Sequence, residues 1–561
     1  MRRGMGAGRL GRVGRAWPLA FLVFFLICAA WVFASPYDGA PDEVRHLIRA
    51  AGVVKGQIFA RPAIKPGLGN AGAYQTVPRG LVRGKAPTSR YNYCYHWLPA
   101  RSAACAPVPG GGKAPTTVIT GAGRYNPVYY AAVGEPLVLW PDWTGILLAR
   151  LISAALCAAF LASAWLSCLE WRRSRLLIAG LLVAATPAFF ELAGAVNPNS
   201  PEIAAGISLV AAAIPLLLDG GATYAQGWTR RTAVAAIAIG QFRSMGPELI
   251  AGLLVVLLLP PQRAQFRQLW KRHSVRWWSA GVLASCVLGV TWTIISGVGD
   301  IGNIAHSKYT AGLILRTEFE FNGRLLRVVE QMIDGFSYYD TKPPHLILAV
   351  WAIAICFLLA TAFAWGTLLD RWRLGALIAG TLAIPVLFEV AAANTFGLSF
   401  QGRYILPLAV GTPMLAAFII GSSGRMTTIR QARVIRAMIV LLLPFQLLSL
   451  GHVMDRWQSG VGPGHAVNPL LGSWHPVTGS ALPLVLMTAG LIGLGLLAWR
   501  AAVDPADNER AAQLAASTQV GRQAGSPLVT ADDRGFPAVL ARIWHGRPPA
   551  SPSGAAGRGR G

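Results

Sequence analysis

The chain has 561 residues, of which 54% are hydrophobic and only 13% are charged. This composition, with its many long uncharged runs, excludes an ordinary soluble domain and indicates a membrane protein with several spans. The formal net charge of +26 would suggest a nucleic-acid partner if the protein were soluble. Many of the arginine and lysine residues, however, stand in short connections between apolar runs, where cytoplasmic loops carry them. We therefore expect membrane lipids, and no nucleic acid, among the partners.

The apolar runs and the charge bias of their connections predict an all-α polytopic membrane protein with about twelve transmembrane segments. Two of the twelve are short helices, described below. The other ten are expected at about 16–34, 145–169, 176–192, 202–218, 278–298, 345–366, 374–392, 404–421, 434–452 and 481–500. Residues 1–15 are basic, and Phe33-Ala34-Ser35-Pro36 is a poor cleavage site, so we expect an uncleaved first span. Both termini would then be cytoplasmic, with the transmembrane domain, residues 16–500, in the plasma membrane.

One apolar stretch, about 232–260, is too long for a single span and is interrupted by a polar segment that contains Arg243 and Glu248. It could form one kinked helix or two short helices that meet at the polar segment. The basic connection 263–276 must lie inside, as must Arg230-Arg231, and two short crossings satisfy both conditions. Arg243 and Glu248 would then be recessed ionisable groups, which are functional candidates unless they form a structural ion pair.

Two long polar segments fall on the external side of this topology. We expect residues 35–140 to form a folded first external loop with juxtamembrane helices, and residues 299–344 to form a second large loop. The tail, residues 501–561, has a composition typical of a disordered cytoplasmic segment. Cys94 and Cys105 share the first loop without the spacing of a zinc site, so a disulfide is the better interpretation and no metal site is predicted.

The most informative stretch is 40–49, which follows the first span directly. Its proline and its acids favour the start of a helix at this point. On such a helix Asp42, His46 and Arg49 share one face, whereas Glu43 lies to one side. The pattern predicts either a group of catalytic side chains at the external membrane surface or a capped amphipathic helix among the headgroups.

Other polar groups lie at the external ends of later predicted spans. Asn197 and Asn199 precede the fourth span, where they could simply cap a helix. Gln401, Arg403 and Tyr404 open a late span, where Arg403 could instead be an interfacial anchor. This one-sided distribution favours an outward-opening cavity over a transport pathway, which would place such groups on both faces. No nucleotide-binding motif is present, so a donor would have to arrive through the membrane.

Three motifs together resemble the bacterial membrane family called domain of unknown function 2142, over nearly the whole chain to about residue 500. They are Pro41-Asp42-Glu43-Val44-Arg45-His46, Asn197-Pro198-Asn199 and Gln401-Gly402-Arg403-Tyr404-Ile405-Leu406-Pro407. The Asp-Glu-x-x-His element also resembles the first-loop acidic motif of class C glycosyltransferases, notably the protein mannosyltransferases. Those enzymes use polyprenyl-phosphate sugars on the extracytoplasmic side. The third position of the asparagine motif departs from the pattern, since Asn199 stands where much of the family has an acid.

The resemblance implies a role for each matching residue. Asp42 would be the general base of an inverting transfer, and Glu43 would position the acceptor or the donor. The leaving phosphate calls for guanidinium donors, for which Arg403, Arg243 and Arg49 are the candidates in that order. The full expected substrate-binding set is His46, Arg49, Asn197, Asn199, Arg243, Glu248, Gln401, Arg403 and Tyr404. His46 could equally be a structural partner of the acids. The cofactor is unknown, and a divalent cation stays open.

The sequence thus predicts an integral membrane glycosyltransferase with a class C fold. It would move a sugar from a polyprenyl-phosphate donor to an envelope glycan, lipid or protein outside the cytoplasm. The alternatives are a flippase or transporter of a lipid-linked saccharide, and a polymerase or ligase of envelope polysaccharide.

Overall fold

The computed structural model describes most of the first 503 residues. The described ranges are 7–65, 69–82, 94–106, 108–110, 112–219, 225–259, 263–300, 309–320, 323–341, 344–462 and 467–503. The chain divides into two units, Met1–Asp504 and Pro505–Gly561, and the described residues all belong to the first. The expected disordered tail therefore lies outside the described residues, apart from its first three positions.

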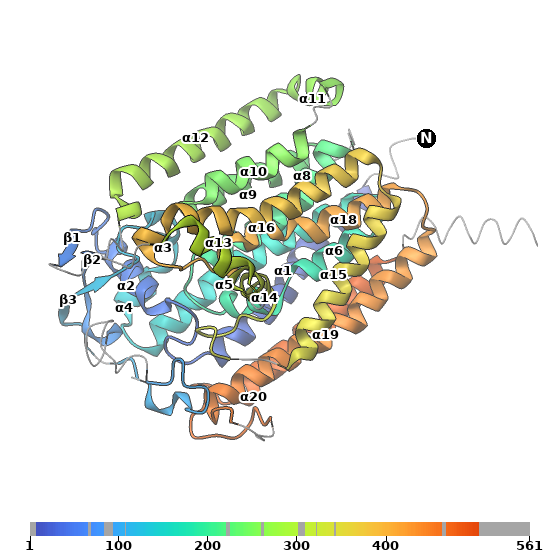
Figure 1. Cartoon of the computed structure of the whole chain (residues 1–561). Helices are drawn as coiled ribbons and strands as arrows, with labels where there is room; N and C mark the ends of the chain where they lie inside the picture. Colours follow the sequence, from blue (N-terminus) through green and yellow to red (C-terminus); the bar gives the residue numbers. More distant parts are fainter. Residues whose placement is uncertain are drawn as a thin grey trace, which may run out of the picture. The chain divides into compact units, whose positions relative to one another are not determined.

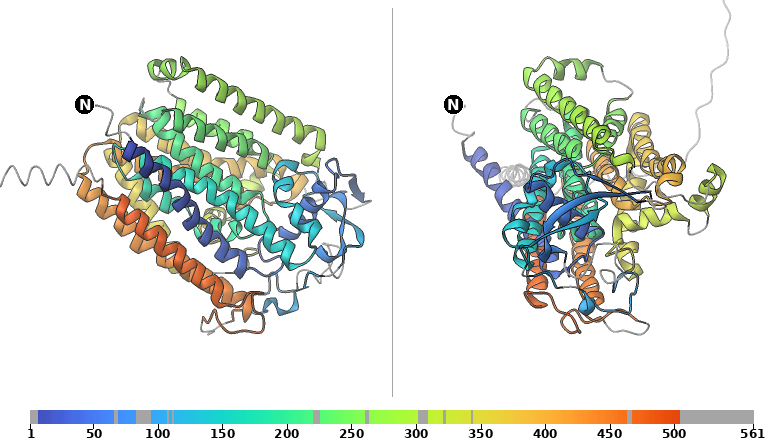
Figure 2. Two further views of the ribbon diagram at one scale, coloured as in Figure 1. Left: turned by 180° about the vertical axis from the view of Figure 1, so that it is seen from behind. Right: turned by 90° about the vertical axis from the view of Figure 1, so that its left-hand side faces the viewer.

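Within those ranges, nine helical segments are long and apolar enough to cross a membrane. Figures 1 and 2 show the long helices side by side in a bundle. They are α1 (Ala7–Ala34), α5 (Trp143–Glu170), α8 (Asn199–Leu218), α12 (His273–Ser296), α15 (His345–Trp365), α16 (Leu368–Phe396), α17 (Gly402–Ala409) continued by α18 (Gly411–Ser422), α19 (Thr428–Gln458) and α20 (Ala481–Ala501). This confirms a mostly helical polytopic class, while the count of twelve spans stays a prediction.

The expected single span at 176–192 is instead two short helices, α6 (Leu177–Ala184) and α7 (Pro187–Ala193). Thr186 caps the second helix, because its side chain accepts a hydrogen bond from the Phe189 N–H. Proline lacks an N–H and cannot continue a helix from the preceding turn, so Pro187 starts a new one.

The long apolar stretch also forms two helices, α9 (Ala225–Phe242) and α10 (Gly246–Leu258), which meet at residues 243–245. The turn is tight, since a Cβ on Gly246 would lie 2.0 Å from the carbonyl oxygen of Ile239. Only glycine allows so close an approach of two backbones. Of the two alternatives left open by the sequence, the structure has the pair of short helices, followed by α11 (Arg263–Trp270).

Cysteine labelling at this turn tests its orientation. Ser244 is exposed, and the predicted topology opens the turn to the external side. A Ser244→Cys variant should therefore react with a membrane-impermeant maleimide added to intact cells. Labelling only from the cytoplasmic side of inverted vesicles would contradict the topology.

The segment expected to form the first external loop, which we call the first external segment, contains helices and a small sheet that was not predicted. Its elements are α2 (Glu43–Val54), β1 (Pro62–Lys65), β2 (Gly69–Pro78), β3 (Pro115–Thr120), α3 (Pro127–Val133), α4 (Glu135–Leu139) and the short 3-10 turns Arg79–Leu81 and Ala103–Cys105. The antiparallel strands run in the order β1-β2-β3. In β2, the buried residues Ala73, Gln75 and Val77 alternate with the half-buried Tyr74 and Thr76, the period of two that a strand produces.

The sheet packs its buried face on α2, where a Cβ on Gly52 would collide with the Gln75 side chain. A disulfide joins Cys94 to Cys105, as expected for this segment. The second external segment contributes a 3-10 turn (Val298–Asp300), α13 (Ala311–Phe319) and α14 (Arg324–Asp334). The helices α3 and α4 of the first segment pack on α5, whereas the second segment packs on α7 and α17. Tyr338 of the second segment reaches Asp42 at the start of α2.

Candidate active site

Asp42 stands at the N-terminus of α2 and faces two arginine side chains. Its Oδ2 atom lies 2.6 Å from Nη2 of Arg403, at the start of α17, and its Oδ1 atom lies 3.3 Å from Nη1 of Arg45. The Asp42 backbone N–H donates to the Tyr338 hydroxyl over 3.2 Å. The residue has φ of 64°, a left-handed conformation that is uncommon outside glycine and often marks a functional position. The carboxylate is thus fixed, while about a quarter (27%) of the side chain remains exposed.

The two arginines keep this carboxylate ionised. Burial alone would raise the pKa of Asp42, but the opposite charges of Arg45 and Arg403 outweigh burial and lower it to about 2. Asp42 therefore carries a full negative charge at any pH that a cell envelope meets.

Arg403 and Arg243 both contact the ring of Tyr404. Their guanidinium carbons lie 5.1 Å and 4.9 Å from its centroid, within range of a cation–π interaction. Arg243, at the break between α9 and α10, also lies 5.4 Å from the ring of Tyr125. Its Nη1 donates to Oδ1 of Asn199 over 2.7 Å. Side chains from four distant parts of the chain are thus brought into one cluster.

The cluster combines three guanidinium groups with carboxylates. Arg45, Arg243 and Arg403 face the carboxylate of Asp42, and Glu202 on α8 is close enough to Arg243 to interact with it. Glu191 on α7 also interacts with Arg403, so three acids face the three arginines. Within the cluster, the donors Arg403 Nε and Asn199 Nδ2 and the acceptor Glu202 Oε1 are buried and have no hydrogen-bond partner among the described residues. Two such donors beside guanidinium groups favour a ligand with hydrogen-bond acceptors at this position.

His46 is buried one helical turn after Asp42 and shares a hydrogen bond of 2.8 Å between its Nδ1 atom and the Tyr130 hydroxyl. Burial is the main cause that lowers its pKa, and Arg243 and Arg403 add to it against the opposing charge of Asp42, so that the pKa falls to about 3. His46 is consequently neutral and supports the cluster without adding a charge.

Glu43 does not face the cluster, although it was expected beside Asp42 at the substrate. Its carboxylate is fully buried and forms a two-pronged ion pair with Arg150, with N–O distances of 2.7 Å and 2.6 Å. The Val196 N–H donates to the same carboxylate over 3.1 Å. This geometry ties α2 to α5 and to the turn before α8, so Glu43 holds the helix that carries Asp42.

Three other expected ligands also lie away from the Asp42 carboxylate. Arg49 is buried and donates to the carbonyl oxygens of Gln57, Ile58 and Tyr125. Asn197 donates to the carbonyl of Pro41 over 3.0 Å, so it positions the residue before Asp42. Glu248 is exposed on the first turn of α10.

Gln401 contributes indirectly, through a turn that sequence reasoning missed. Its Oε1 accepts a hydrogen bond from the Tyr339 hydroxyl over 3.2 Å, and Arg403 Nη1 donates to the same hydroxyl over 3.4 Å. The neighbouring Tyr338 donates to Asp38 and accepts from the Asp42 N–H. Ser337 and Tyr339 have φ of 53° and 59°, a strained conformation that the sequence does not signal. Arg150 could have been found, because it is a charged residue inside a predicted span.

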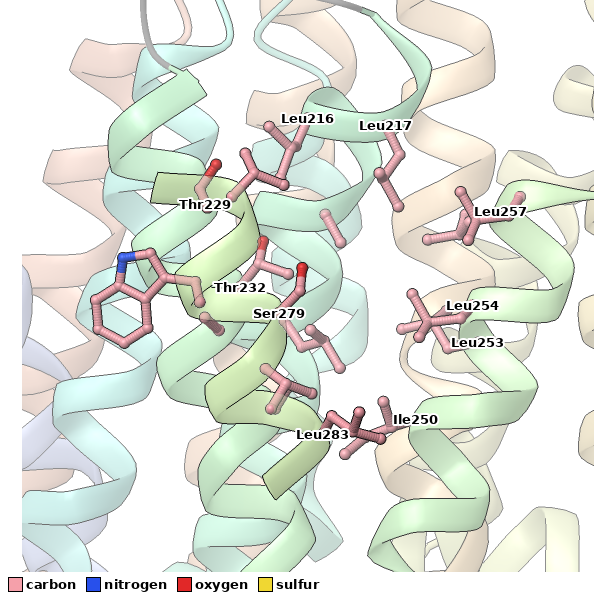
Figure 3. A pocket seen from close by; sticks show the side chains of 18 of the residues that line it. Leu216, Leu217, Thr229, Thr232, Ile250, Leu253, Leu254, Leu257, Ser279 and Leu283 are labelled. Carbon is pink, nitrogen blue, oxygen red and sulfur yellow. The ribbon is translucent and has the colours of Figure 1, made fainter. Parts of the chain in front are cut away.

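An apolar cavity of about 460 Å³ lies beside the cluster, between α8, α9, α10, α11 and α12. Figure 3 shows leucine side chains such as Leu216, Leu253 and Leu283 directed into it. Its lining ends at Ala236 of α9 and Cys286 of α12. About one helical turn further along the same two helices, Gly240 and Gly289 line a second pocket of only about 10 Å³, whose lining includes Arg243 and Tyr125. The apolar cavity and a guanidinium group thus lie along the same pair of helices.

Together, the bundle and its polar cluster define a polytopic helical membrane protein with a charged site at one end. The family model described as "Predicted membrane protein (DUF2142)" matches residues 25–412, and the chain belongs to this family. No curated protein sequence matches the chain.

Two crystal structures of ArnT from Cupriavidus metallidurans show a distant likeness. The form bound to undecaprenyl phosphate is 14% identical, with a TM-score of 0.41 over 88% of this chain and 77% of that one. The apo form is 15% identical, with a TM-score of 0.39 over 89% and 78%.

Proposed function

We propose that this protein is a glycosyltransferase that moves a sugar from a polyprenyl-phosphate donor to a cell-envelope acceptor on the extracytoplasmic face. The observation that carries the proposal is the Asp42 carboxylate, held by Arg403 at 2.6 Å beside a second guanidinium, that of Arg243. The resemblance of the Asp-Glu-x-x-His element to the first-loop acidic motif of class C glycosyltransferases supports the same activity.

The reaction we propose is an inverting displacement at the anomeric carbon. The bond between this carbon and the phosphate oxygen breaks, a bond to the acceptor hydroxyl oxygen forms, and the hydroxyl proton passes to Asp42. Polyprenyl phosphate is the leaving group. A carboxylate with a pKa of about 2 suffices as the base, because the attacking hydroxyl becomes strongly acidic once it bonds to an oxocarbenium-like carbon. Arg403 then has the role of orienting Asp42.

Arg243 is better placed than Arg403 for the donor phosphate, which reverses the order expected from the sequence. Its guanidinium lies about one helical turn beyond the end of the apolar cavity along α9, whereas one Arg403 nitrogen already binds Asp42. A polyprenyl chain in the cavity would place its phosphate at Arg243, where the guanidinium stabilises the leaving charge. Asn199 and Tyr125 fix that guanidinium in place.

Replacement of Arg403 should change the pH dependence of the transfer. In the wild type the pKa of Asp42 is about 2, so protonation of Asp42 should not reduce the rate above about pH 4. Arg403→Gln removes one of the two charges that lower this pKa, and the acid limb of the rate profile should move to higher pH. The rate measured from pH 3 to pH 8 checks this; an unchanged acid limb in the variant would contradict the role of Arg403.

A donor assay separates the proposed activity from its alternatives. Purified protein in proteoliposomes is given radiolabelled polyprenyl-phosphate sugar and an envelope extract, and both transfer and transbilayer movement of the label are measured. A transferase yields labelled acceptor and free polyprenyl phosphate. Movement of intact donor across the bilayer without transfer would instead identify a carrier. Transfer of preassembled glycans, but not single sugars, would identify a polymerase or ligase.

A further inference from the structure

We propose that the exposed basic side chains around the three-stranded sheet, those of Arg45, Arg61, Arg79 and Lys113, form a binding surface for a polyanionic envelope glycan. The inference rests on the proposed function in one respect, since this glycan would be the acceptor. The four basic residues lie in a stretch of the sequence, residues 44–134, that contains twelve basic residues and no acidic one. Two of the twelve, Arg49 and Arg124, are buried and donate to backbone carbonyls, so they are not part of this surface.

The second external segment does not share this excess of basic residues. Residues 299–344 contain five basic and six acidic residues, a balanced set. Both segments are expected on the same side of the membrane and belong to the same basic chain. Neither factor therefore explains why only residues 44–134 of the first segment lack acidic residues. A surface of one sign attracts partners of the opposite sign and repels others.

The cations extend outward from the active site along β3. At its end nearest the site, the Thr120 hydroxyl donates to the carbonyl of Arg45 over 2.9 Å, and Arg45 lies 3.3 Å from Asp42. At its other end, the Arg79 N–H donates to the carbonyl of Ala114 over 2.9 Å, and the Arg79 and Lys113 side chains are exposed. Six residues of strand span about 20 Å. A ligand with repeated negative charges could contact both ends at once.

The outer face of the sheet points to water. Its inner face is covered by α2, and Figure 1 shows the three strands at one end of the helical bundle. The outer face carries Thr76 and Thr117, which share a hydrogen bond of 2.9 Å, and the ring of Tyr74, 6.0 Å from the Arg61 guanidinium carbon. Hydroxyls and an aromatic ring among cations suit a sugar chain that carries phosphate or carboxylate groups. This placement favours a polymer in the aqueous phase over the membrane plane.

Binding is tested with the full chain in nanodiscs of zwitterionic lipid, with carboxymethyl-dextran and unmodified dextran of equal length as probes. The test variant is R79Q/K113Q, and the matched control is R316Q/R327Q, which removes two exposed charges from the second external segment. We expect the wild type to bind carboxymethyl-dextran and not dextran. The test variant should bind about tenfold more weakly or worse, and the control variant should bind as the wild type does.

Equal binding of both dextrans, or equal losses in the two variants, would overturn the inference. The inference would also be wrong if the protein bound phosphatidylglycerol vesicles and not the polymer, and if R79Q/K113Q weakened the vesicle binding. That result would identify a membrane-docking surface. Transfer from radiolabelled donor is measured on the same proteins. Polymer binding without any transfer would contradict the proposed function alone, whereas transfer that needs no anionic polymer would contradict this inference alone.

Discussion

Asp42→Asn should reduce sugar transfer by at least about 100-fold, because general-base catalysis contributes about 100- to 10,000-fold and the amide cannot accept the proton. The substitution keeps the size of the side chain, about a quarter of which is exposed, so the local packing is retained. The rate of labelled acceptor formation in membranes, at equal protein content, measures the effect. Donor binding should persist, since Arg243 and the apolar cavity remain.

Glu320→Gln is the matched control for this substitution. Glu320 is a carboxylate of the second external segment, its side chain is 55% exposed, and it pairs only with its helical neighbour Arg316 in the described structure. Its loss should leave the transfer rate unchanged. If Asp42→Asn transferred sugar at the wild-type rate, the base would have to be another group.

The second large effect should be on stability, at the pair of Glu43 and Arg150. Both side chains are fully buried, so Arg150→Met leaves the Glu43 carboxylate without a countercharge in the protein interior. Breaking one side of a buried ion pair costs about 3–5 kcal/mol. Unfolding by denaturant in detergent micelles, followed by tryptophan fluorescence, should show a loss of this size.

Two comparisons sharpen this expectation. Arg316→Gln breaks the exposed pair with Glu320, whose side chains are 79% and 55% exposed, and should cost less than about 1 kcal/mol. The double variant E43Q/R150M should recover part of the loss, because no unpaired charge is left buried. Equal costs for the buried and the exposed pair would show that Glu43 does not hold α2 in place.

Three charged residues of the candidate site could be identified from the sequence because each lies at the end of an apolar run or interrupts one. Asp42 follows the first span, Arg243 interrupts an apolar stretch, and Arg403 opens a late span. Charges at the ends or breaks of apolar runs are expensive to keep in a membrane, so their positions in the sequence already indicate function. Their assembly around Tyr404 depends on helix packing, which one sequence does not reveal.

The direction of individual side chains was harder to predict. Glu43 and Asp42 are adjacent, but the left-handed backbone at Asp42 and the pairing with Arg150 direct Glu43 into the protein. Arg49 shares a helical face with Asp42, but its guanidinium donates hydrogen bonds to the backbone carbonyls of Gln57 and Tyr125. The second of these lies 76 residues away in the sequence, so the sequence does not reveal the contact. The sheet was missed because its strands stand among many Gly and Pro residues, which favour loops in a sequence.

A cryo-EM structure of the protein with undecaprenyl phosphate would test the proposed transfer site most directly. We expect density for the polyprenyl chain in the apolar cavity between α9, α10 and α12, and the phosphate within hydrogen-bond distance of Arg243, on the side that faces Asp42. A phosphate bound elsewhere, for example beside α11 at the opposite end of that cavity, would contradict the claim that Asp42, Arg243 and Arg403 form one transfer site.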